Sequence, residues 1–243
     1  MKFAVISDIH GNAPALHAVL EEIHQIGGIG HIYCLGDMIG IGPHTNEVMD
    51  ILCNRADVSM ITGNHDEAVL ALLNDEDYPG SHSHIRKHHE WVAEELENSY
   101  MTELNKLSRT IEEQIEGHSL FFTHYQYHDQ DAPIHKDPLS SIVKPSLKNM
   151  KKLFRNCQHT FIGFGHHHPV HYYQSSTTTF LNAGSLGCQK GGVAPYAIID
   201  VKQGDIKVAL KRASYDKTDF LESYEKLNVP DRWNLLKIFH GVG

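Results

Sequence analysis

The chain has 243 residues, of which 41% are hydrophobic and 21% are charged, a composition typical of a folded globular protein. Its formal net charge of -9 argues against binding to a nucleic-acid polymer and against a nuclease, because non-specific nucleic-acid binding depends on an excess of Lys and Arg. It does not exclude a small anionic substrate, since bound metal ions would reverse the field locally.

The four cysteines are scattered and form no Cys-x-x-Cys pair, which favours reduced thiols over a disulfide framework. No apolar run is long enough to span a bilayer, and no signal peptide precedes the first expected strand. We therefore expect a cytoplasmic protein that does not bind membranes. Because no repeat or linker divides the sequence, residues 1–243 are expected to form one domain, and no pattern indicates an oligomeric state.

Strands and helices are predicted to alternate at the start of the chain. Apolar strands are expected at 3–7, 32–35 and 58–62, with amphipathic helices at 13–27 and 46–54 between them. Such alternation is typical of parallel βαβ units. The polar residues that follow these strands are therefore expected at one edge of a sheet.

Residues 74–109 interrupt this alternation. A polar stretch at 74–84 precedes two expected helices at 85–96 and 101–107, and we interpret the segment as a helical insertion beside the site, where it would select the substrate. Further strands are expected at 110–116, 118–123, 160–164, 170–174, 178–182, 195–201 and 206–211, with a basic helix at 144–155. A C-terminal tail at about 214–243 is predicted to be helical around 220–227 and 232–239.

Residues that can bind metal ions follow five of the expected strands. The clusters are Asp8-Ile9-His10, Gly36-Asp37, Gly63-Asn64-His65-Asp66, His124 and Gly165-His166-His167-His168. Asp, Asn and neutral His are ligands for divalent transition metals, and strand ends in α/β proteins face the crevice where ligands bind. Each cluster alone is also compatible with a turn or a plain strand end. Five of them in one chain indicate a metal site.

In this order the clusters resemble the signature of the calcineurin-like metallophosphoesterases. The resemblance extends from residue 2 to about residue 200 and includes segments shared with small bacterial and archaeal phosphoesterases at 7–12, 46–48 and 182–187. It implies an α/β fold, the four-layer α-β-β-α sandwich of this family, which the strand-rich second half would complete. It also implies a hydrolase of phosphate esters that depends on two divalent metal ions.

The resemblance further implies a role for each residue of the clusters. One metal would be held by Asp8, His10 and His168, the other by Asn64, His124 and His166, and both would be bridged by Asp37. His65 would be the general acid that protonates the leaving oxygen, with Asp66 orienting its ring. In such sites two ions activate a bridging hydroxide and clamp the phosphoryl group. The mixed nitrogen and oxygen ligands suit Mn, Fe, Zn or Ni.

The chain departs from the usual family pattern at three positions, of which Ala183, in place of a common Pro, is expected to be harmless. Relatives often carry Gly-His-Thr-His where this chain has Gly165-His166-His167-His168, so His167 is an alternative ligand. Relatives often have Gly after the histidine at 124, where this chain has Tyr125. We therefore expect Tyr125 and His128 to shape the substrate pocket, and His128 is a second alternative ligand.

The expected substrate is a small phosphorylated molecule of nucleotide type, hydrolysed at a phosphomonoester or phosphodiester bond, with Asn12 and Arg86 as further candidate contacts. A dinucleoside polyphosphate hydrolase is an alternative, because the insertion and the loop at 125–140 could enclose an elongated anion, and so is a protein Ser/Thr phosphatase. A non-catalytic scaffold is the alternative of another class. Of the 20 histidines, five belong to this scheme, and we interpret most of the other 15 as exposed.

Overall fold

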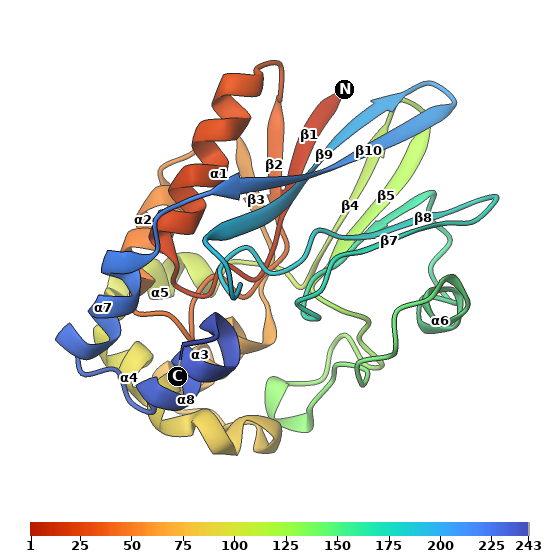
Figure 1. Ribbon diagram of the computed structural model, residues 1–243. Helices are drawn as coiled ribbons and strands as arrows, with labels where there is room; N and C mark the ends of the chain where they lie inside the picture. Colours follow the sequence, from red (N-terminus) through yellow and green to blue (C-terminus); the bar gives the residue numbers. More distant parts are fainter. Residues whose placement is uncertain (243) are drawn as a thin grey trace.

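The computed structural model describes residues 1–242 and contains two stacked β-sheets with helices on their outer faces (Figure 1). The first sheet has the order β10-β9-β1-β2-β3, with β1 (Lys2–Ile6), β2 (His31–Cys34), β3 (Val58–Met60), β9 (Val193–Lys202) and β10 (Asp205–Ser214). The second has the order β4-β5-β6-β8-β7, with β4 (Thr110–Ile115), β5 (His118–Thr123), β6 (Phe161–Gly163), β7 (His171–Gln174) and β8 (Thr179–Asn182). The expected α-β-β-α architecture is confirmed.

The first sheet is organised around β1. Strands β1, β2 and β3 pair in parallel, as the alternation of strands and helices predicted. The C-terminal strands β9 and β10 return to this sheet and extend it antiparallel on the other side of β1. They do not join the second sheet, so the two halves of the chain are interlocked.

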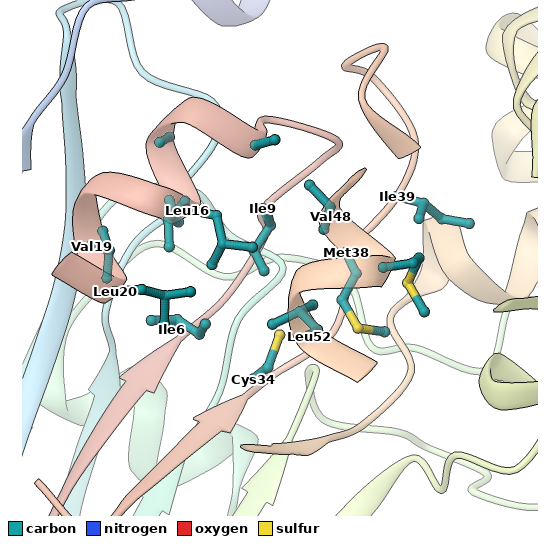
Figure 2. Close-up of a cluster of buried hydrophobic side chains, with 14 of the residues drawn as sticks. Ile6, Ile9, Leu16, Val19, Leu20, Cys34, Met38, Ile39, Val48 and Leu52 are labelled. Atoms are coloured by element: carbon teal, nitrogen blue, oxygen red, sulfur yellow. The ribbon is translucent and has the colours of Figure 1, made fainter. Parts of the chain in front are cut away.

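Helices α1 (Ala13–Ile26) and α2 (Thr45–Cys53) cover the outer face of the first sheet. The apolar side chains of α1 recur every three or four residues, and Leu16, Val19 and Leu20 point at Ile6 and Cys34 of the sheet (Figure 2). Burying side chains of this size contributes about 1.5–3 kcal/mol each. The loop that leaves β1 is therefore held between a strand and a helix that are both fixed.

The two sheets pack on each other through aromatic rings. Phe3 of β1 meets Phe122 and Phe161 of the second sheet edge-on, with ring centroids 5.9 and 6.2 Å apart. Tyr33 of β2 stacks on Phe122 at 4.1 Å. Aromatic pairs of this kind contribute about 0.5–1.5 kcal/mol beyond the area they bury. This core fixes the loops of one sheet relative to those of the other.

Helix α6 (Leu147–Leu153) covers the outer face of the second sheet. It is shorter than the helix predicted at 144–155, because Ser146 is extended and its side chain accepts a hydrogen bond from the N–H of Asn149 at 3.2 Å. This is N-cap geometry, so the helix begins after Ser146. A short 3-10 turn, η2 (Ile134–Lys136), lies in the loop before it.

The insertion contains the 3-10 helix η1 (Gly80–Ile85) and the helices α4 (Arg86–Glu95) and α5 (Asn98–Leu104). It packs on α3 (Asn64–Leu73), a helix that the sequence analysis did not predict. The polar residues that were interpreted as a strand end form the first turn of α3. There the carboxylate of Asp66 accepts the N–H of Gly63 at 2.9 Å, half of a capping box.

The C-terminal tail contains α7 (Thr218–Lys226), α8 (Arg232–Leu235) and the π-helical turn η3 (Leu236–His240) (Figure 1). Phe220, Tyr224 and His240 are buried together, and the Tyr224 hydroxyl is 2.9 Å from Nε2 of His240. These contacts fix the tail to the body of the protein. Within residues 1–242, no helix combines the length and the apolar character needed to cross a membrane.

Candidate metal centre

The expected ligands lie on loops that leave the carboxyl ends of strands. Four of them, Asp8, His10, Asp37 and His166, have positive φ angles of 54°, 49°, 52° and 65°. This conformation is uncommon for residues other than glycine and persists where the surrounding structure imposes it, often at functional sites. The N–H of Asp8 donates to the carbonyl of Gly36 at 3.0 Å, and the N–H of His10 donates to that of Asp37 at 2.9 Å. The loops after β1 and β2 thus hold each other in place.

Two glycines allow the other loops to approach equally closely. Gly36 has φ 86°, and a Cβ there would lie 2.5 Å from the nitrogen of Gly63 and 2.8 Å from Nδ1 of His124. A Cβ on Gly165 would overlap Oγ of Ser7. Larger residues at either position would push the ligand loops apart.

The expected ligands converge in two groups on either side of Asp37. In the first group, Nε2 of His10 lies 3.2 Å from Nε2 of His168 and 3.9 Å from Oδ1 of Asp8. Oδ2 of Asp37 is 3.8 Å from Nε2 of His10. These are the residues expected to hold one metal and the bridge.

The second group contains Asn64, His124 and His166. Nε2 of His124 lies 3.0 Å from Oδ1 of Asn64 and 3.2 Å from Oδ2 of Asp37. Asp37, His124 and His166 each place a ligand atom within 4.8 Å of those of the other two. The same carboxylate oxygen of Asp37 therefore faces both groups.

The donor set fits divalent cations. Oδ1 of Asp8 is buried without a hydrogen-bond partner among the described residues, which is costly for a carboxylate oxygen. Burial lowers the pKa values of His10 and His166 to about 3, so both imidazoles are neutral, as ligation requires. Nδ1 of His124 lies 2.7 Å from the carbonyl oxygen of Leu35 and donates to it, which directs Nε2 toward the site.

Asp37 carries the negative charge around which the site is arranged. Burial opposes this charge, but the nearby His124 and His65 hold the pKa of Asp37 well below its usual value. Burial alone would lower the pKa of His124. The Asp37 carboxylate outweighs this effect and raises the pKa of His124 to about 10. In Asp8, by contrast, burial prevails and raises the pKa. The extra proton on His124 balances the negative charge of Asp37. A cation bound between the two carboxylates would supply this positive charge instead.

His65 is linked to the insertion and not to its neighbour in sequence. Its Nδ1 lies 2.9 Å from Nε2 of His89 in α4, and Nδ1 of His89 lies 2.8 Å from the hydroxyl of Tyr78. The Tyr78 hydroxyl donates to the carbonyl of His82 at 3.1 Å, so it accepts the Nδ1–H of His89. Nε2 of His89 then accepts the Nδ1–H of His65. These hydrogen bonds fix the tautomer of His65 with its proton on Nδ1. Nε2 is then free to take up a second proton.

The expectation that Asp66 orients His65 is wrong. The Asp66 carboxylate accepts four backbone N–H groups, those of residues 37–39 and of Gly63, at 2.8 to 3.1 Å. Burial and the charge of Asp37 raise the pKa of Asp66 to about 7, while these hydrogen bonds oppose the rise. Because a side chain in the first turn of α3 points back toward the N-terminus of the helix, Asp66 holds the loop that carries Asp37 and does not reach the ring of His65.

Two of the expected substrate contacts are buried structural residues. Asn12 is the N-cap of α1: its Oδ1 accepts the N–H of Ala15 at 3.1 Å, and its Nδ2 donates to the Gly187 carbonyl at 2.8 Å. Tyr125 is fully buried, its ring lies 5.2 Å from that of His166, and its hydroxyl accepts the N–H of Val143 at 3.2 Å. Neither side chain is accessible to a substrate, so both expectations are wrong.

The other two expected contacts lie away from the candidate ligands. Arg86 forms an exposed ion pair with Glu90 at 2.8 Å. His128 lines a separate cavity and belongs to no group of converging ligand atoms within residues 1–242, and neither does the alternative ligand His167. The ring of His167 instead packs against that of His171, with centroids 4.8 Å apart. The register with His166 and His168 facing the site is the one that the structure adopts.

The interpretation of the remaining histidines as exposed is wrong for several of them. His88, His89, His171 and His240 are buried, and Nε2 of His82 lies 2.8 Å from Nδ2 of Asn64. Four histidines fall between residues 82 and 89, in a segment expected beside the site, and this clustering was the available signal. Cys188 was also missed: its thiol lies within 4.8 Å of ligand atoms of His10 and His168. Burial raises the pKa of this thiol well above its usual value.

The comparisons with known proteins agree with this geometry. The calcineurin-like phosphoesterase superfamily domain matches residues 1–204, and the chain belongs to this family. An uncharacterized protein of Methanocaldococcus jannaschii is 30% identical over 98% of this chain and 97% of its own length. The crystal structure of a metallophosphoesterase from Sphaerobacter thermophilus covers 100% of this chain and 99% of its own, with a TM-score of 0.75 at 22% identity. A symmetrical bis(5'-nucleosyl)-tetraphosphatase of Cronobacter sakazakii is 32% identical over 74 residues, 30% of this chain and 26% of its own.

Proposed function

We propose that the protein is a phosphoesterase that binds two divalent metal ions and hydrolyses a phosphomonoester or phosphodiester bond of a small, nucleotide-type substrate. The observation that carries the proposal is the position of Asp37, whose Oδ2 lies 3.8 Å from Nε2 of His10 and 3.2 Å from Nε2 of His124. A carboxylate between two imidazole groups can bridge two cations. Mn, Fe, Zn and Ni all suit this mixture of nitrogen and oxygen donors.

The protein side chains have separate tasks in this proposal. Asp8, His10 and His168 hold one ion, Asn64, His124 and His166 hold the other, and Asp37 holds both. Ions bound there supply an activated water and neutralise charge on the phosphoryl oxygens. Asn64 ligates through Oδ1, since His82 lies on the side of its Nδ2.

His65 is the proposed general acid. Burial lowers its pKa well below the usual value, and the Asp37 carboxylate opposes this effect. A bound phosphate dianion adds negative charge beside the ring and favours the imidazolium, which then gives its Nε2 proton to the leaving oxygen. His89 keeps the other nitrogen protonated and fixes the plane of the ring.

The experiment that tests this proposal is a hydrolysis screen on protein that has been stripped of metal and reloaded with Mn²⁺. The expected result is metal-dependent release of product from phenyl phosphate or diphenyl phosphate, whose leaving group needs a proton, with a turnover that falls about 10²- to 10⁴-fold in His65→Ala. Metal content should be the same in both proteins. Absence of turnover with every metal tried would contradict the enzyme and favour a scaffold on this fold.

A second candidate is a dinucleoside polyphosphate hydrolase. It is favoured by the 74-residue match to the tetraphosphatase of Cronobacter sakazakii. Diadenosine tetraphosphate should therefore be included in the same screen. Whether it is hydrolysed should depend on the shape and charge of the cavity beside the site.

A further inference from the structure

A cavity of about 760 Å³ opens on the candidate metal centre, and Asn64, His65 and His166 form its floor. Three separate segments form its walls: the 3-10 helix at 81–85, the loop at 134–142 and the C-terminal tail at 231–239. The family match ends at residue 204, so the tail wall lies outside the family domain.

Several of the wall side chains are apolar. Ile85, Ile142, Ile238 and Phe239 are among the side chains that line it. Ile142 and Ile238 are 50% and 62% exposed, large values for aliphatic side chains that line one cavity. Apolar surface gathered in a hollow beside a reactive site is typical of a place where a ligand packs.

The charges of the cavity disfavour a second anion. Asp137 and Asp231 line it, and no Lys or Arg is among its lining residues in the described part of the chain. The basic side chains of Lys144 and Arg155 line an adjoining cavity of about 580 Å³, which meets the first at Ser140 and Ser141. A chain of phosphates that extended from the metal centre into the first cavity would meet two carboxylates and no cation, and like charges brought together in this way oppose binding.

The tail wall is fixed in place before any ligand binds. The ring of Phe239 packs on His168, with centroids 5.7 Å apart, so the tail contacts an expected ligand. His240 is held by the Tyr224 hydroxyl at 2.9 Å, and its carbonyl accepts Nζ of Lys217 at 3.3 Å. A preformed wall loses little conformational entropy when a ligand packs against it.

We propose that this cavity binds the organic part of the substrate, and that the substrate is an ester of a single phosphoryl group whose organic part is uncharged and packs an apolar face, such as that of a nucleobase, against the walls. The proposal rests on the proposed function, because it places the phosphoryl group at the candidate metal centre. It makes the C-terminal tail a determinant of specificity. It also argues against a polyphosphate substrate.

Binding of uncleavable phosphonates tests the cavity without relying on turnover. Calorimetry on the Mn²⁺-loaded protein would compare phenylphosphonate with methylphosphonate, and burial of the ring predicts affinity at least about tenfold higher for the phenyl compound. Ile238→Lys should reduce this preference severalfold, since it places a cation on the apolar wall. Leu227→Lys, at an exposed tail residue that does not line the cavity, should retain the preference. Equal affinities for the two phosphonates, or an unchanged preference in Ile238→Lys, would overturn the proposal.

Hydrolysis then separates this proposal from the proposed function. We expect a higher kcat/KM for phenyl phosphate than for diadenosine tetraphosphate. Ile238→Lys should reduce the difference in kcat/KM between these two substrates. The opposite order would overturn the substrate class and leave the phosphoesterase intact. Tight binding of phenylphosphonate together with absence of hydrolysis of either ester would instead refute the proposed function while supporting the binding site.

Discussion

Nε2 of His89 lies 2.9 Å from Nδ1 of His65, so a helix of the insertion contacts the proposed general acid directly. His89 is fully buried, and its other nitrogen is held by Tyr78. The insertion therefore does more than border the site. It sets the orientation and the tautomer of a residue that belongs to the family domain.

Replacing His89 should impair substrates according to their leaving groups. In His89→Leu the ring of His65 loses its acceptor, so proton donation to a poor leaving group becomes inefficient, and kcat for phenyl phosphate should fall about tenfold or more. The 4-nitrophenyl ester, whose leaving group needs little protonation, should be affected much less. Steady-state kinetics on the two esters measure the difference.

His89→Gln is the matched control for that prediction, because its amide oxygen can still accept the Nδ1–H of His65. It should recover most of the activity lost in His89→Leu, and metal content should stay constant in both. If His89→Leu reduced kcat equally for both esters, the role of His89 would be purely structural.

Asn12 should matter for stability and not for substrate binding. Asn12→Ala removes the cap of α1 and the donors to Gly187 and Tyr215, so the free energy of unfolding should fall by about 1–3 kcal/mol in urea titrations. Asn12→Asp keeps the capping oxygen but turns a second acceptor toward the Gly187 carbonyl, so it should lose stability as well. Normal stability combined with a large rise in KM would show that Asn12 contacts the substrate after all.

The buried histidines make the protein sensitive to acid. Burial lowers the pKa of His88 from 6.5 to about 4, and neither of its ring nitrogens has a hydrogen-bond partner among the described residues. The unfolded chain therefore binds more protons between these pH values. Stability should fall as the pH drops from 6.5 to 4, by about 3 kcal/mol for this residue alone, and should not change through His88 above that range.

His88→Leu tests this dependence. Urea titrations of the parent and the variant should differ by a constant amount at pH 7 and 8, and the difference should shift in favour of the variant as the pH falls toward 5. Parallel stability curves across the whole range would mean that the pKa of His88 is the same in the folded and unfolded states.

Much of the fold could be predicted from the sequence, because hydrophobic periodicity and strand-end polar residues are local signals. The parallel order of β1, β2 and β3 followed from them. The helix at 64–73 was missed because its first turn carries Asn64, His65 and Asp66, whose polar character resembles a loop. The return of β9 to β1 pairs residues nearly 200 positions apart, a contact that no local pattern encodes.

The expected ligands could be named from the order of their motifs, whereas their neighbours could not. Asn12 and Tyr125 were expected at the substrate, yet capping and burial place them inside the structure. His89 reaches the site because α4 packs on α3, and His82 reaches it from η1, which precedes α4; both positions depend on tertiary contacts. Residues on an insertion can be placed only once its packing is known.

The central claim is that Asp37 joins two metal positions, and metal stoichiometry tests it most directly. Elemental analysis of protein reloaded with Mn²⁺ should find two ions in the parent chain, one in His168→Ala, which belongs to a single group, and close to none in Asp37→Asn. Retention of one full ion by Asp37→Asn, or a single ion in the parent, would contradict the account.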